Sequence, residues 1–185
     1  MPYVYPIQIA AVMRRCADLS ILPSQRLLLI SLQEQTMRRF TLQDGAYQLS
    51  HRYAISSSAK PPSCQADSFG TPTGLHAIAD CIGQQAQLGM VFEARTDIGK
   101  CYWELTPEKC EKNLITSRIL RLKGLEPGLN LGPNCDSYDR YIYIHGTNHE
   151  ARIGRPFSGG CIELYNTDIV ELFDLVHSED LVYIS

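Results

Sequence analysis

Short apolar runs separated by turn residues occupy the first third of the chain, and this pattern is typical of a β-sheet. Residues 27–33 begin with four consecutive apolar side chains, and residues 47–55 alternate apolar and polar positions. Residues 38–42 are a third short segment of this kind, and Asp44-Gly45 is a turn signal before the last one. The sequence therefore predicts a three-stranded meander.

Three later segments, residues 90–95, 114–122 and 141–144, have the apolar and β-branched composition of strands. Residues 75–82 are ambiguous, because their pattern of apolar positions fits either a strand or a helix. Residues 56–70 contain Pro61-Pro62 and many small polar side chains, so we expect a loop there, and a second loop at 129–140.

Helical patterns flank these strands. Residues 7–19 place apolar side chains at helical spacing, and Pro23 prevents that helix from continuing. Residues 106–112 indicate a short helical or turn insert. Near the C-terminus, Asn166 is expected to cap a helix with one apolar face. That face consists of Ile169, Leu172, Phe173 and Val176. The predicted fold class is therefore mostly β with added helices (α+β).

Length and charge exclude several classes of protein. At 185 residues the chain is long enough to bury a proper core, and its net charge is only −3. Arg14-Arg15 and Arg38-Arg39 are isolated basic pairs, so nothing indicates a nucleic-acid partner. The apolar runs fall far short of the ~20 residues needed to span a bilayer, so we expect no membrane anchor. The oligomeric state is left open.

Cysteine usage and the N-terminus bear on the compartment. The seven cysteines are scattered, odd in number and without a framework spacing, which favours a reducing environment. Residues 1–6 have no basic n-region, and the first apolar run ends at Arg14-Arg15 rather than at a small-residue cleavage site. The sequence therefore predicts a cytoplasmic protein.

One short stretch offers both a base and a nucleophile. His145 follows the predicted strand 141–144, so it is expected to be held rigidly at the strand's end. Ser158-Gly159-Gly160 then turns the chain sharply before Cys161, because glycine tolerates φ > 0. An imidazole within reach of a thiol can accept its proton and stabilise the thiolate. The stretch therefore predicts a thiol enzyme.

Two other interpretations of this stretch are open. In the first, Cys161 is one more buried apolar cysteine, since free cysteine is among the most buried residue types. His145, His149 and Cys161 are also potential zinc ligands, but no set of four closely spaced ligands is present. We therefore expect no metal and no cofactor. His76 is interpreted as a structural histidine and receives no role.

The same residues resemble the L,D-transpeptidases of the YkuD type. That family's signature is His-Gly-Thr, a spacer of about fifteen residues, and Ser-His-Gly-Cys-Ile-Arg; this chain has His145-Gly146-Thr147-Asn148 and Ser158-Gly159-Gly160-Cys161-Ile162. A second block, Thr71-Pro72-Thr73-Gly74 after Ser56-Ser57-Ser58, also matches. The resemblance implies a YkuD-like β-sandwich or barrel over residues 27–185, with an N-terminal helical extension over 1–26 and a helix after the cysteine.

The resemblance also implies an activity. Family members act on peptidoglycan tetrapeptide stems, where the cysteine attacks the carbonyl of the third residue and the terminal D-alanine leaves. By this resemblance Cys161 is the nucleophile, His145 the base, and the carbonyl of Gly146 holds the imidazole. The amides of Gly160 and Cys161 are oxyanion candidates. Ser158 and Gly159 would contact the substrate, which is a stem peptide or muropeptide.

Two departures from the family motif affect this expectation. Gly159 replaces the usual histidine, so His145 would act without a second imidazole. Glu163 replaces the usual arginine and reverses the charge expected to meet a substrate carboxylate, a charge that Arg152 or Arg155 could restore. The departures also support an alternative, a catalytically inactive module that binds peptidoglycan. With His145 and Cys161 both present, the sequence favours the enzyme, acting mainly as an L,D-carboxypeptidase.

Overall fold

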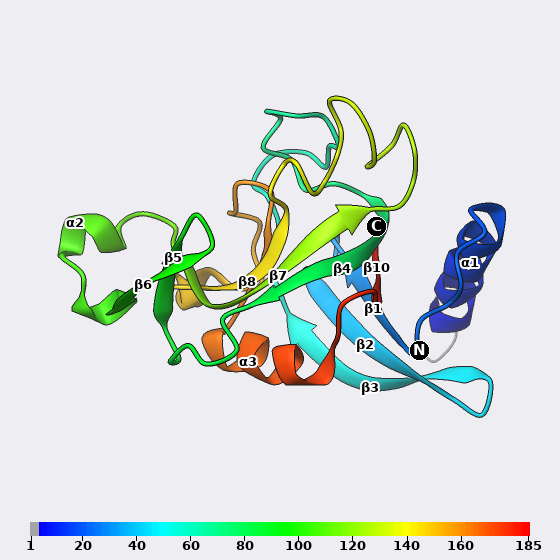
Figure 1. The fold of residues 1–185 in the computed structure, drawn as a ribbon, viewed down its shortest axis with the longest axis horizontal. Helices are drawn as coiled ribbons and strands as arrows, with labels where there is room; N and C mark the ends of the chain where they lie inside the picture. Colours follow the sequence, from blue (N-terminus) through cyan, green and yellow to red (C-terminus); the bar gives the residue numbers. More distant parts are fainter. Residues whose placement is uncertain (1–3) are drawn as a thin grey trace.

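The sheet contains ten strands and dominates the computed structural model, which describes residues 4–185, with side chains from residue 7 onward (Figure 1). The strands are β1 (Arg26–Ser31), β2 (Thr36–Gln43), β3 (Ala46–Ala54), β4 (Gly74–Ile82), β5 (Met90–Glu93), β6 (Thr96–Cys101), β7 (Ile115–Gly124), β8 (Tyr143–Thr147), β9 (Ile162–Leu164) and β10 (Leu181–Ile184). The helices are α1 (Val4–Asp18), α2 (Pro107–Cys110) and α3 (Asn166–Leu175), with 3-10 turns at Tyr102–Glu104 and Glu150–Arg152. The predicted mostly-β class with added helices is confirmed.

Strands β1, β2 and β3 form the predicted meander. Asp44 and Gly45 are the two loop residues of the β2–β3 hairpin, with φ values of 49° and 77°, and Gln43 pairs with Ala46 across it. Positive φ at both loop positions matches the right-handed twist of the strands, and glycine adopts it without strain. The main path of the sheet runs β3-β2-β1-β10-β4-β7-β5-β6, and β8 pairs with both β7 and β9.

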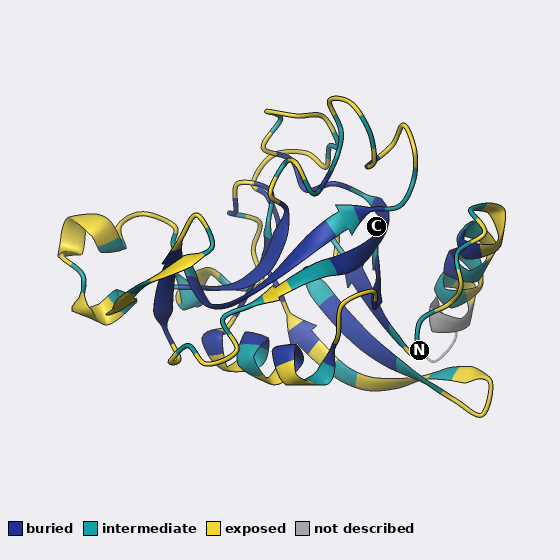
Figure 2. Cartoon of the chain, in the orientation of Figure 1, coloured by how far each residue is buried: buried dark blue, intermediate teal, exposed yellow. Residues whose placement is uncertain are grey.

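Both faces of strand β1 are covered, which explains its unbroken run of apolar residues. Leu27 and Leu29 pack with Val12 and Cys16 of α1. Leu28, on the opposite face, belongs to a larger core built from α3 and most of the strands. Burying each of these leucines contributes roughly 1.5–3 kcal/mol. Figure 2 shows the buried residues along the central strands, whereas α2 and the β6 end of the sheet are largely exposed.

Helix α1 is tied to the turn after β7. Arg15 forms an ion pair with Glu126. The other carboxylate oxygen of Glu126 accepts a hydrogen bond from the backbone N–H of Leu75, 2.6 Å away.

None of the helices in residues 4–185 combines the length and apolar character that a membrane span requires. Residues 1–3 lie outside the described residues, and the expectation about a leader depends partly on them. The division into an N-terminal extension (1–26) and a catalytic domain (27–185) stays a prediction.

Several predicted boundaries were wrong. The strand expected at 141–144 begins two residues later, because Tyr141 lies in a turn with φ 55°, so His145 sits inside β8 rather than after it. The ambiguous segment 75–82 is strand β4. Asn166 is the first residue of α3 rather than its cap. Its side chain instead donates to the carbonyl of Thr147, 2.9 Å away, and so ties α3 to β8.

Candidate active site

Parallel pairing of β8 with β9 brings the predicted base and nucleophile together. Ile144 is in register with Ile162, which places Cys161 beside Tyr143 at the start of β9. The backbone N–H of Tyr143 lies 3.4 Å from Sγ of Cys161 and donates to it. Side chains two positions apart on a strand share a face, so His145 and Tyr143 project to the same side. Ile144 and Ile162 point the other way, into the core.

His145 is almost fully buried, with 3% of its surface exposed, and its ring is fixed by one hydrogen bond. Nδ1 lies 2.7 Å from the carbonyl oxygen of Gly146. A carbonyl only accepts, so Nδ1 carries the proton and Nε2 is the nitrogen with a free lone pair. This is the tautomer that a general base requires.

Gly146 is required by close packing. A Cβ added there would lie 2.6 Å from Oδ1 of Asn166 and 2.8 Å from the carbonyl oxygen of Thr116, both closer than real side chains come. The absence of a side chain at Gly146 therefore lets β8 lie against β7 and α3, with His145 on the opposite face of the strand.

The thiol of Cys161 is neutral at rest. Burial is the main cause that raises the pKa of this thiol to about 12, and the negative charge of Glu163 acts in the same direction. The N–H of Tyr143 and the guanidinium of Arg140 lower this pKa, but they do not outweigh the burial. The thiol is therefore a nucleophile only when a base takes its proton in the same step.

The turn before Cys161 is closed by Ser158. Its hydroxyl donates to the carbonyl oxygen of Cys161, 2.6 Å away, and accepts from the N–H of Gly160 at 3.2 Å. Gly160 has φ 130°, where only glycine fits without strain. The Gly160 amide would have to release Ser158 to bind an oxyanion. Of the two predicted donors, the Cys161 amide is therefore the better candidate.

The two matched sequence blocks meet at this turn. Ser58 forms a β-bridge with Ser158, and its N–H donates to Oγ1 of Thr71, 2.9 Å away. Ser56 and Glu163 exchange two backbone hydrogen bonds of 2.8 Å. Residues 56–58 thus act as a short extra strand beside the cysteine turn, which explains why both blocks accompany the same site.

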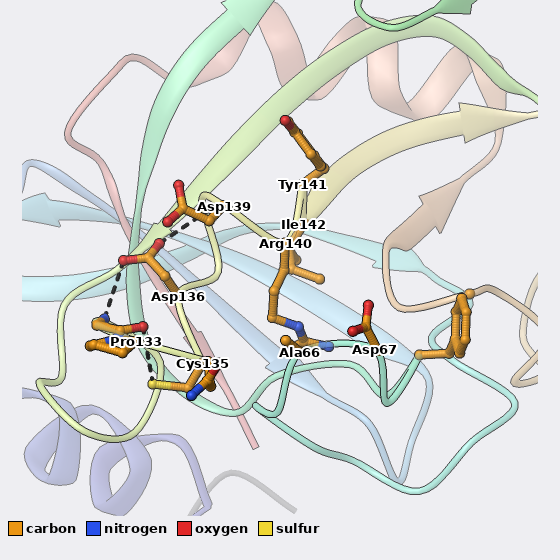
Figure 3. Close-up of a pocket in the computed structure, with 13 residues that line it drawn as sticks. Ala66, Asp67, Pro133, Cys135, Asp136, Asp139, Arg140, Tyr141 and Ile142 are labelled. Atoms are coloured by element: carbon orange, nitrogen blue, oxygen red, sulfur yellow. Dashed lines mark hydrogen bonds between the residues drawn. The ribbon is translucent and has the colours of Figure 1, made fainter.

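A cavity of about 720 Å³ lies between the loops 56–70 and 129–140 (Figure 3), and neither Cys161 nor His145 is among the residues that line it. It reaches the site at Tyr141, whose carbonyl lies 3.6 Å from Sγ of Cys161, and at Gly159. Arg140 crosses between the loops and donates to the carbonyl oxygens of Ser63 and Gly70, at 3.0 and 2.8 Å. This volume falls within the range of roughly 300–1,000 Å³ that is usual for ligand-binding sites.

Comparison with known proteins identifies the family. The sequence model of the YkuD family, described as the L,D-transpeptidase catalytic domain, matches residues 25–184. The chain belongs to this family. It is 45% identical over 51 residues to the putative L,D-transpeptidase YkuD of Bacillus subtilis, covering 27% of this chain and 31% of that protein. It is 40% identical over 47 residues to the putative L,D-transpeptidase YqjB of the same organism, covering 25% and 27%.

Solved structures share the fold. An L,D-transpeptidase from Mycobacterium smegmatis aligns with a TM-score of 0.50 and 15% identity, over 87% of this chain and 58% of that one. One from Xylanimonas cellulosilytica aligns with a TM-score of 0.51 and 16% identity, over 93% and 68%. The predicted YkuD-like fold is therefore confirmed. The matched segments span less than a third of the curated Bacillus relatives.

The structure places the charged residues of this L,D-transpeptidase domain differently from what the sequence suggested. Glu163 is 1% exposed, so its carboxylate does not face a substrate in the cavity. Arg152 stacks on the ring of Phe157, with Cζ 4.3 Å from the ring centroid, and Arg155 is exposed. Neither arginine lines the 720 Å³ cavity.

Two arginines that the sequence did not single out contact the surroundings of the thiol. One is Arg140, described above. The other, Arg95, stacks on the ring of Tyr141 at 5.0 Å and donates to the hydroxyl of Tyr143, 3.3 Å away. Neither residue belongs to the motif, because Arg95 lies in the β5–β6 hairpin, distant in the sequence, and Arg140 lies in the loop before β8.

The remaining histidines have structural contacts. His76 is fully buried and hydrogen-bonded at both nitrogens, as the structural interpretation expects. Nε2 of His149 lies 3.3 Å from the carbonyl oxygen of Glu111, and its ring packs against Phe157. Within residues 4–185, no group of three or more histidine, cysteine, aspartate or glutamate side chains is arranged to hold a metal ion.

Proposed function

We propose that this protein is a cysteine-dependent L,D-carboxypeptidase and L,D-transpeptidase that acts on peptidoglycan tetrapeptide stems and releases the terminal D-alanine through a thioacyl-enzyme. The observation that carries the proposal is the β8–β9 pairing that brings a buried imidazole, with Nδ1 held by Gly146, to a thiol whose neighbours Tyr141 and Gly159 line a cavity. Family membership supports a transpeptidase or peptidase reaction.

The reaction begins when Sγ of Cys161 forms a bond to the carbonyl carbon of the third stem residue while its proton passes to Nε2 of His145. The carbonyl oxygen becomes an oxyanion, which the Cys161 amide would stabilise. The C–N bond to D-alanine then breaks, and the proton on His145 passes to the leaving nitrogen. Water or an amine then releases the acyl group.

We further propose that hydrolysis outweighs transfer, so the main product is the tripeptide. A protein in a reducing compartment would meet free muropeptides rather than polymerised wall. The seven cysteines, all unpaired in the described part of the chain, support such a compartment. We therefore also propose a cytoplasmic location and a role in muropeptide recycling.

Incubation with a disaccharide-tetrapeptide, with and without millimolar D-amino acids, tests the proposal by mass spectrometry. We expect tripeptide and free D-alanine in both conditions, and a transient adduct on Cys161. Cys161→Ala should abolish turnover, and His145→Gln should lower the rate by about 10²–10⁴-fold. The control is Cys81→Ala, which removes an exposed thiol outside the site and should keep the wild-type rate.

The outcomes separate the competing functions. Mainly exchanged or dimeric products would show that transfer predominates. Binding of the muropeptide without turnover, equally strong in wild type and Cys161→Ala, would establish the inactive peptidoglycan-binding module instead. Imipenem, which is in complex with an L,D-transpeptidase in one solved structure, is a second probe, and we expect it to acylate Cys161 before any other cysteine.

A further inference from the structure

Glu163 is a buried carboxylate with one oxygen unaccounted for. Only 1% of the residue is exposed. Its Oε1 accepts a hydrogen bond from Nδ2 of Asn113, 2.6 Å away. Its Oε2 is buried, and no partner for it is found among the described residues. Leaving a buried charged oxygen without a hydrogen bond costs at least about 1–3 kcal/mol, so the position calls for a functional explanation.

The strand register places this carboxylate beside His145. Glu163 on β9 is directly in register with His145 on β8, and paired strands lie about 5 Å apart. Asn113, which holds Oε1, also accepts a hydrogen bond from Oγ1 of Thr147 at 3.1 Å. Thr147 is two residues after His145 and shares its face of β8. The Glu163 side chain therefore crosses β8 on the face that carries His145.

Few charged groups act on the thiol and imidazole pair. Glu163 and Arg140 are the charged side chains that influence Cys161, with opposite signs. Along β8, the face of His145 carries Tyr143, whose hydroxyl contacts Arg95, and the uncharged Thr147. Glu163 is thus the negative residue paired in register with the imidazole that would become positive.

We propose that Glu163 is a positioning residue whose buried carboxylate offsets the positive charge that His145 acquires when it accepts the Cys161 proton. This inference rests on the proposed function. The S–H bond breaks as the S–C bond forms, and Nε2 gains the proton and a positive charge. The carboxylate lowers the energy of that imidazolium until its proton passes to the leaving nitrogen. The same charge disfavours a free thiolate, so proton transfer and attack are coupled.

Replacing the Glu163 carboxylate with an amide separates its effect on the Cys161 thiolate from its effect on the His145 imidazolium. Glu163→Gln retains an acceptor for Asn113 and breaks no bond at Oε2, so it should fold. Without the negative charge, a free thiolate forms more easily, and we expect alkylation of Cys161 by iodoacetamide at pH 8.5 to be roughly three- to tenfold faster. Turnover of the tetrapeptide should instead fall roughly tenfold. The acid limb of the kcat/KM profile should move to lower pH.

Two further variants distinguish a charge effect from a structural one. Glu163→Asp keeps the charge and should stay within about threefold of wild type in both assays; a merely structural role would make this shorter side chain at least as harmful as Gln. Glu150→Gln is the matched control, because Glu150 is also held by an asparagine, Asn166, and does not act on Cys161. It should leave alkylation unchanged.

Alkylation needs no substrate, so this inference and the proposed function fail separately. Wild-type protein without turnover, but with faster alkylation in Glu163→Gln, would reject the proposed function and retain the charge effect on the thiol. Unchanged alkylation together with an unmoved pH profile in Glu163→Gln would overturn the role of Glu163. An equal loss of turnover in Glu163→Gln and Glu163→Asp would also overturn it, since the charge would then be irrelevant.

Discussion

Acidification should destabilise this protein through His76, which the fold holds in its neutral form. The ring is fully buried between β4 and the loop before β8, with Nδ1 3.0 Å from the carbonyl oxygen of Gly74 and Nε2 2.9 Å from Oγ of Ser137. Burial is the main cause that lowers the pKa of His76 from 6.5 to about 4; the hydrogen bond to Gly74 opposes this shift, and the positive charge of Arg140 adds to it. A protonated ring would also lose its bond from the Ser137 hydroxyl.

The size of the effect follows from the difference between the two pKa values. The unfolded chain binds a proton near pH 6.5, whereas the folded protein binds one only near pH 4. Stability is therefore complete above pH 6.5 and falls as the pH drops through that window. At about 1.4 kcal/mol per pKa unit, the loss is about 2 kcal/mol at pH 5 and about 3 kcal/mol at pH 4. This is a large part of a typical stability of about 5–15 kcal/mol.

Urea unfolding of dilute protein between pH 8 and pH 4, followed by fluorescence, measures this loss. Carboxylates also titrate there, so the relevant quantity is the difference in unfolding free energy between wild type and His76→Gln. We expect that difference to shrink by about 2 kcal/mol between pH 7.5 and pH 5. His177→Gln, which removes an exposed imidazole, is the control and should follow wild type. A difference that stays constant over this range would refute the reasoning.

Two further predictions test the packing and the charges at the site. Gly146→Ala should lower the unfolding free energy by about 1–3 kcal/mol in urea titration, because the added Cβ would meet Asn166 and Thr116. Gly159→Ala is the control: nothing lies within 4 Å of its Cβ, so its unfolding free energy should stay within about 0.5 kcal/mol of wild type. Arg140→Gln should slow iodoacetamide alkylation of Cys161 and speed proteolysis within residues 61–70; unchanged rates of both would contradict its assigned contacts.

The parts of the fold that the sequence predicted are those with a strong local signal. The Asp44-Gly45 hairpin, the apolar run of β1 and the apolar stripe of α3 each specify their structure within a few neighbouring residues. Strands β6, β9 and β10 were not predicted. β9 and β10 have only three and four residues, and β6 is largely polar and exposed, so their pairing depends on distant partners.

Motifs located the two candidate reacting groups of the site, but not their surroundings. His145 and Cys161 belong to a sequence signature, because their spacing reflects the β8–β9 pairing. Asn113 and Arg140 approach from a loop and a turn outside that signature, and each acts through contacts made only after folding. The same limit explains why Glu163 was expected at the substrate: its position in the motif was visible, but its burial was not.

The opposed charges around Cys161 determine when the thiol becomes reactive. With its pKa near 12, the resting thiol has little thiolate character, and oxidation as well as alkylation depends on thiolate character. An enzyme in a compartment with fluctuating redox conditions would therefore keep its nucleophile intact until a substrate arrives. The free-energy cost of starting from a neutral thiol would fall on the proton transfer, in which His145 becomes positive. In the role proposed for it, Glu163 would lower that cost while suppressing the free thiolate, so a single buried carboxylate would serve both protection and turnover.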